Sequence, residues 1–190
     1  MRKIKNFKIN IRPKEISRIL KKFSDLKELS IEVEESVQRA CYFYGHTIKP
    51  AVVYDTFSKE SADLNLNFFD FSEKWIAVSP FVLTIGSGLK DEFEKQIDIF
   101  GEWTTKIVSA ISADTLEQSK SFIQRLIAQE AKEEQCELSR AVEITENLDV
   151  IQNLLPLEKI NVSVDEQNKF IPSYTVAGVY YWLPVKKRRK

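Results

Sequence analysis

Apolar residues recur at helical spacing in the first quarter of the chain. Pro13 is followed by apolar residues at three- and four-residue steps, namely Ile16, Ile19, Leu20 and Phe23, and proline is favoured in the first turn of a helix. A second run of this kind, residues 31–44, lies between Ser30, a favoured N-cap, and Gly45, a typical helix end. After a short extended start at residues 7–9, the pattern predicts two helices.

From Ala51 onward the pattern changes to that of strands. Residues 51–57, 64–69 and 74–86 are rich in β-branched and aromatic side chains, and two of the three alternate between apolar and polar positions. Residues 159–166 and 174–184 have the same character. These segments predict a sheet.

Three further segments return to helical spacing. We predict helices over residues 89–100, over about 102–131, and over 148–155, where Pro156 follows. The order is helices, strands, helices and strands, which is typical of an α+β protein with a largely antiparallel sheet. We therefore expect a single domain over residues 1–185, a twisted, mainly antiparallel sheet packed with helices, and one long central helix. The remaining basic residues, 186–190, are expected to form a disordered tail.

Composition narrows the possible partners. The chain has 190 residues with 28 lysines and arginines against 28 aspartates and glutamates, so no net charge would recruit nucleic acid or an anionic membrane. No apolar run approaches the roughly 20 residues that cross a bilayer, and the start lacks a signal peptide. We expect a cytoplasmic protein that binds neither nucleic acid nor membrane.

The residues that usually build metal sites and catalytic triads are scarce. Cys41 and Cys136 form no paired motif and are interpreted as free thiols. The only histidine, His46, follows Gly45, which indicates a helix-terminal or turn position. Neither a zinc signature nor a Walker A loop is present, so no metal and no catalytic residue is assigned.

Three segments resemble, in order, the activation (reactivation) domain of cobalamin-dependent methionine synthase and its free-standing relatives. Residues 83–118 are similar to that family's Thr-Ile-Gly strand end, helix, break and long alanine-rich helix with a glutamate. Residues 149–184 resemble its Leu-Leu helix end, Glu-Lys element, proline and final strand. Residues 12–20 look like the amino-terminal helix of the free-standing members. The resemblance spans almost the whole chain.

This resemblance implies a function. In that family the domain binds S-adenosylmethionine and offers its methyl group to cobalamin on a partner, while a flavodoxin-like donor supplies an electron. It therefore implies an accessory component of a corrinoid methyltransferase, with no catalytic residue of its own and a positioning role. The family's helix glutamate corresponds to Glu117, which becomes the first candidate for cofactor binding. A solvated charged position on the helix is the alternative interpretation.

One family motif is missing. The family has an Arg-x-x-Pro-Gly-Tyr loop after the long helix, but here no glycine occurs between Gly101 and Gly178. We expect the corresponding loop over residues 137–145, where Arg140 is the candidate for the lost cation, although it could be an ordinary surface charge. Losing the arginine clamp removes charged hydrogen bonds worth on the order of 1.5 to 3 kcal/mol each. We expect weakened S-adenosylmethionine binding or, alternatively, a non-catalytic module that docks on a corrinoid protein without this ligand.

Two other features carry candidate chemistry. Tyr174, Tyr180, Tyr181 and Trp182 lie on one predicted strand, of which one face is expected in the core and the other exposed. An exposed Tyr181 or Tyr174 could stack on adenine or a corrin edge, and Tyr181 is the third candidate cofactor-binding residue. The Gly86-Ser87-Gly88 turn could hold an anion at the helix start, although turn geometry alone also explains it.

Overall fold

The computed structural model of the chain describes residues 1–59, 74–95 and 100–185, and its first two helices begin at the predicted residues. Helix α1 spans Pro13–Ser24 and α2 spans Ile31–Gly45. The Ser30 Oγ accepts a hydrogen bond from the backbone N–H of Val33 at 3.4 Å, as expected for an N-cap. His46 directly follows α2. Both predicted helices and the helix-terminal histidine are confirmed.

The remaining helices include one long element. Helix α4 spans Thr104–Glu133, close to the predicted 102–131, and follows the 3-10 turn η2, Gly101–Trp103. Helix α3 spans Gly88–Lys95, and residues 96–99 of that prediction lie outside the described part. Helix α5 spans Leu148–Leu154, and the 3-10 turn η3, Leu157–Ile160, follows it.

The strands form a mainly antiparallel sheet. Within the described residues its order is β1-β2-β4-β9-β5, with β3 added on β4 and β6 on β9, and each pair is antiparallel. The strands are β1 Arg2–Lys5, β2 Ala51–Tyr54, β3 Phe57–Ser58, β4 Ala77–Thr84, β5 Cys136–Leu138, β6 Val142–Ile144 and β9 Thr175–Pro184. A separate hairpin pairs β7, Ser163–Val164, with β8, Phe170–Ile171. The α+β class is confirmed.

Some sequence predictions differ from the structure. The extended start forms a strand at β1 and not at residues 7–9. Residues 159–166 begin within η3, where Leu157 and Ile160 turn into the core, and become extended only at β7. The predicted strand 64–69 and the basic tail 186–190 lie outside the described residues. The assignment of residues 1–185 to one family domain stays a prediction.

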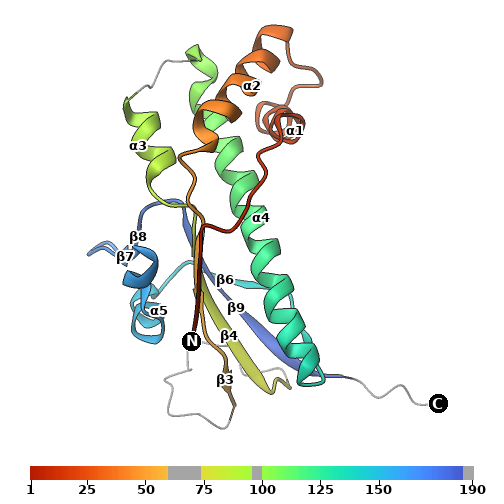
Figure 1. The fold of residues 1–190 in the computed structure, drawn as a ribbon, viewed down its shortest axis with the longest axis vertical. Coiled ribbons are helices and arrows are strands. Elements are labelled where there is room, and N and C mark those ends of the chain that lie inside the picture. Colours follow the sequence, from red (N-terminus) through yellow and green to blue (C-terminus); the bar gives the residue numbers. More distant parts are fainter. Residues whose placement is uncertain (60–73, 96–99, 186–190) are drawn as a thin grey trace, which may run out of the picture.

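Three apolar clusters hold these elements together. On one face of the sheet, Ile123 and Ile127 of α4 pack against Phe81, Tyr180 and Trp182. On the other face, α5 and η3 cover the side chains that point away from α4. The N-terminal half of α4 packs with α1 and α2 in a third cluster. Figure 1 shows the result: helices gather at one end, and the sheet lies between α4 and α5 at the other.

Two further sequence inferences can be compared with the structure. Cys41 and Cys136 are free thiols, as predicted, and both are buried. Burial, with a smaller contribution from the charge of Asp114, raises the pKa of Cys41 to about 12, so this thiol is protonated at neutral pH. Among the described helices, none combines the length and the apolar character needed to cross a membrane.

Candidate functional site

Glu117 lies on the exposed side of α4, near the middle of the helix. Residues on the buried side of α4 contact the sheet, whereas Glu117 is solvent-exposed. Its charge still reaches the sheet: burial, and after it the negative charge of Glu117, raise the pKa of Tyr180 to about 12. The charge of this exposed carboxylate thus acts on a buried tyrosine of β9.

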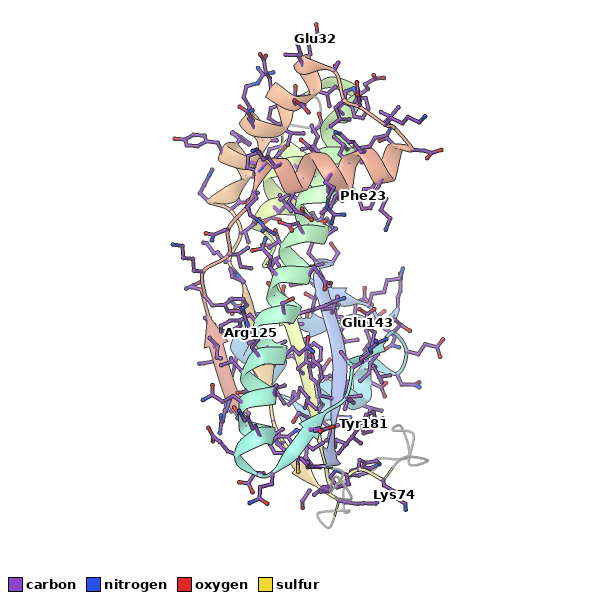
Figure 2. All side chains as sticks on the ribbon, turned by 90° about the vertical axis from the view of Figure 1, so that its right-hand side faces the viewer. Phe23, Glu32, Lys74, Arg125, Glu143 and Tyr181 are labelled. Atoms are coloured by element: carbon purple, nitrogen blue, oxygen red, sulfur yellow. The ribbon has the colours of Figure 1, made fainter. Side chains whose placement is uncertain are left out.

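An ion pair next to Glu117 joins α4 to the sheet edge. The Lys120 ammonium contacts the Glu143 carboxylate on β6, and Figure 2 shows Glu143 beside α4. Glu143 pairs with Gly178 of β9, and the Phe81 ring fills the space beside Gly178, 2.7 Å from an added Cβ. A residue without a side chain at this position leaves room for β6 and Phe81 together.

The segment that should hold the family's ligand loop has a regular structure here. We expected a loop over residues 137–145, but β5 and β6 occupy most of it, and both pair with β9. Between them, the Tyr181 N–H donates to the Ser139 Oγ at 2.9 Å, and the Ser139 N–H donates to the Tyr181 carbonyl, also at 2.9 Å. The sequence expectation of an irregular loop is wrong, because these residues extend along the edge of β9 and pair with it.

Arg140 lies in the short connection between β5 and β6. Its side chain is exposed, and within the described part of the chain it makes neither an ion pair nor a hydrogen bond. Its carbonyl accepts from the Ser139 hydroxyl at 2.7 Å. The guanidinium is thus available for an anionic group, at the same sheet edge as Glu143.

Tyr181 does not have the predicted exposure. It is 7% exposed and belongs to the cluster under α5 and η3, where its ring lies 6.2 Å from that of Trp75. Tyr180 is 1% exposed and points the other way, toward α4. The expectation that one face of this strand is exposed is wrong, because elements cover both faces of the sheet. Glu117 and Tyr181 consequently lie on opposite faces.

A buried carboxylate lies one turn before Glu117. Asp114 is 5% exposed, and burial raises its pKa, while a hydrogen bond from Gln118 and the charge of Arg12 oppose this. The Gln118 amide donates to Asp114 Oδ2 at 2.7 Å and to the Asn10 carbonyl at 2.9 Å. These contacts fasten the segment before α1 to α4, which is a structural role that the sequence did not indicate.

A cleft of about 620 Å³ lies beside the Gly86-Ser87-Gly88 turn, where it is bordered by α3, the end of β1, the connection from α2 to β2, and η3. An added Cβ at Gly88 would lie 2.4 Å from the Thr47 carbonyl oxygen, and Gly86 has a φ of +83°. The close backbone packing of the turn therefore requires Gly88, and the positive φ favours glycine at position 86. The anion-binding role stays a prediction.

Comparisons with known proteins give a result at the level of fold. Neither a family model nor a curated protein matches the sequence. Among solved structures, the chain is similar to the crystal structure of the MetH reactivation domain bound to AdoHcy, with a TM-score of 0.51 and 13% identity over 91% of this chain and 67% of that one. The resemblance inferred from the sequence is confirmed for the fold, while the identity is too low to transfer the role of any residue.

The sequence predictions found part of the arrangement around Glu117. They indicated Glu117 and Arg140, both of which are exposed. They did not indicate Lys120 and Glu143, whose ion pair joins α4 to β6, or Tyr180, on which the charge of Glu117 acts. Strand alternation separates Tyr180 from Tyr181, yet it does not reveal which of the two faces α4. The glutamate in β6 gave no signal, because the strand is three residues long.

Proposed function

We propose that this chain is an accessory reactivation subunit for a corrinoid methyltransferase of the cobalamin-dependent methionine synthase type, and that it binds S-adenosylmethionine. The observation that carries the proposal is the fold shared with the MetH reactivation domain over 91% of the chain. That domain was crystallised with AdoHcy, the thioether that remains when S-adenosylmethionine gives up its methyl group. A cytoplasmic location and a flavodoxin-like electron donor belong to the same proposal.

The ligand site of this proposal is the surface between α4 and the β5-β6 edge. Glu117 is exposed and would attract the sulfonium cation, and Glu143 adds a second carboxylate across Lys120. Arg140 has a free guanidinium that suits the carboxylate of the amino acid part. Tyr181 lies under the other face of the sheet, so the proposed site consists of Glu117, Arg140 and Glu143.

Only part of the expected ligand chemistry fits these residues. The carboxylates supply attraction for a cation, but β5 and β6 are short strands paired with β9, and neither contains the glycine that lets backbone donors approach a ligand closely. We therefore expect weak binding. The domain would act by holding the methyl donor in position, while a corrinoid on the partner protein supplies the methyl-accepting chemistry.

Isothermal titration with S-adenosylmethionine and with AdoHcy tests the ligand. We expect dissociation constants in the high micromolar to millimolar range for the unaltered chain and binding at least tenfold weaker in Glu117→Gln. Glu102→Gln, which alters an exposed glutamate just before the start of α4, serves as the matched control and should bind like the unaltered chain. Absence of binding at millimolar ligand, or equal binding by both variants, would reject this ligand site.

A second candidate function is a docking module that acts on a corrinoid protein without this ligand. The specific observation in its favour is that regular strands occupy residues 136–138 and 142–144, where the family has its glycine-tyrosine loop. A pull-down with purified methionine synthase separates the candidates. Capture that does not depend on S-adenosylmethionine, together with a flat titration, supports docking alone, whereas failure of capture contradicts both.

A further inference from the structure

The cleft beside the Gly86-Ser87-Gly88 turn lies away from the proposed ligand site. Ile160, which lines it, belongs to the apolar cluster on the face opposite α4. Figure 1 shows α3, one of the elements that border the cleft, on the same side of the sheet as α5. A ligand in this cleft would therefore bind independently of Glu117, and the two sites can be tested separately.

One wall of the cleft carries positive charge that the described residues do not neutralise. Lys5, at the end of β1, and Lys49, before β2, are both exposed, and neither ammonium forms an ion pair or hydrogen bond within residues 1–59, 74–95 and 100–185. On the opposite wall, Lys95 is paired with Glu92 at 3.6 Å. Among the described residues, the two ammonium groups without a partner thus come from two segments, the end of β1 and the residues just before β2, and these segments meet at the same wall.

The backbone around these lysines is held in place before any ligand arrives. The Lys49 N–H donates to the Ile85 carbonyl at 3.0 Å, and the Asn6 N–H donates to the Pro50 carbonyl at 2.7 Å. The close approach of Gly88 to Thr47 joins the start of α3 to the same wall. A preformed backbone wall lowers the conformational cost of binding.

The other groups in the cleft restrict the class of ligand. Lysine ammonium groups bind phosphate as point charges. The side chains of Ser87 and Asn161 add hydrogen-bonding capacity, and the exposed Asp91 carboxylate can accept hydrogen bonds from hydroxyl groups. The volume of about 620 Å³ falls within the range of roughly 300 to 1,000 Å³ that small-molecule sites occupy.

From this combination we infer that the cleft binds a phosphate ester of a small polyhydroxylated compound, with the phosphate at Lys5 and Lys49 and the hydroxyl groups toward Asp91. The inference requires neither S-adenosylmethionine nor a corrinoid partner. A positive result here and a negative one at Glu117, or the reverse, would therefore be distinguishable.

Titration of the isotopically labelled full chain by NMR, with ribose 5-phosphate as the probe, tests the inference. We expect saturable shifts of the amide signals of Thr47, Gly86, Ser87 and Gly88 at low millimolar concentration. Ribose and citrate at equal ionic strength should shift these signals at least tenfold less effectively. The inference would be overturned if citrate had an equal effect or if the shifts lay elsewhere. It would also be overturned if no amide shifts appeared up to 20 times the expected concentration of ribose 5-phosphate.

Charge-matched variants show whether position or net charge is responsible. The double variant Lys5→Gln/Lys49→Gln should lose at least tenfold in affinity for ribose 5-phosphate. Lys3→Gln/Lys8→Gln removes the same charge from two exposed lysines that do not line the cleft, and it should bind like the unaltered chain. All four side chains are exposed, and a thermal melt of each variant verifies folding. Equal losses in the two double variants would contradict the inference.

Discussion

The two faces of the sheet are covered in different ways, and the difference separates the two candidate sites. A single helix of 30 residues, α4, covers one face, so that polar residues on its exposed side lie next to the sheet edge. Short elements, α5 and η3, cover the other face, and an open cleft remains between η3 and the start of α3. The long helix thus places its polar side chains along one continuous surface, whereas the short elements leave an open cleft.

The largest expected effect tests whether α4, on one face of the sheet, and α5, on the other, contribute equally to the free energy of unfolding. Ile123 of α4 and Ile151 of α5 are both fully buried, on opposite faces, and truncating a buried isoleucine to alanine costs about 2 to 5 kcal/mol. We expect Ile123→Ala in the upper half of this range. Ile151→Ala should lie in the lower half, because the short α5 can close over the cavity.

Chemical unfolding of both variants, with the unaltered chain as reference, measures this difference. A single transition with unequal losses supports unequal contributions within one cooperative unit. Equal losses, or a larger loss for Ile151→Ala, would contradict the idea that the short elements adapt more easily than α4.

The second prediction concerns the turn beside the cleft. In Gly88→Ala the new Cβ would lie 2.4 Å from the Thr47 carbonyl oxygen, so two backbone segments must separate. We expect a loss of about 1 to 3 kcal/mol. Gly45→Ala is the matched control, since its Cβ would meet only the Ile11 side chain at an ordinary 3.6 Å, and helix propensity favours alanine.

Thermal unfolding of the two glycine variants gives the comparison directly. Gly88→Ala should unfold at a clearly lower temperature than the unaltered chain, and Gly45→Ala at the same or a higher one. Equal stability of Gly88→Ala and Gly45→Ala would show that the cleft wall is not the tightly packed element described above.

Local signals in the sequence were sufficient for the elements that determine the fold class. The apolar spacing of α1, α2 and α4, together with Ser30 as N-cap and Gly45 as helix end, predicted their bounds to within about two residues. The long strands β4 and β9 were predicted from their β-branched and aromatic residues. In these elements, propensity and tertiary packing favour the same structure.

The elements and contacts that the sequence did not reveal depend on partners far along the chain. Strands β5 and β6 have three residues each, and the edge of β9, about 40 positions later, determines their pairing. The orientation of Tyr181 likewise depends on which face α4 covers. The sequence therefore predicted Glu117 and Arg140 as candidates but not the ion pair between Lys120 and Glu143 that lies next to Glu117.

The smallest expected effect tests the contact between Glu117 and the α4 face of the sheet. The pKa of Tyr180 is raised to about 12, chiefly by burial and secondarily by the charge of Glu117. Glu117→Gln removes only the second cause, so the pKa of Tyr180 should fall but stay above its ordinary value of 10.0. Because the folded-state pKa is raised, the Tyr180 contribution to stability is lost as pH rises from about 10 to 12, and this loss should be smaller in the variant.

Tyrosine-selective NMR labelling, with Tyr180→Phe to assign the signal, measures this pKa in the unaltered chain and in Glu117→Gln. Tyr181, on the opposite face, is the internal control, and its NMR signal should be the same in both proteins. An unchanged Tyr180 would place the Glu117 carboxylate in free solvent and weaken the case for a ligand site on α4. A change at both tyrosines would mean that the substitution disturbs the sheet, since a direct charge effect from α4 should be far weaker at a ring that lies under α5.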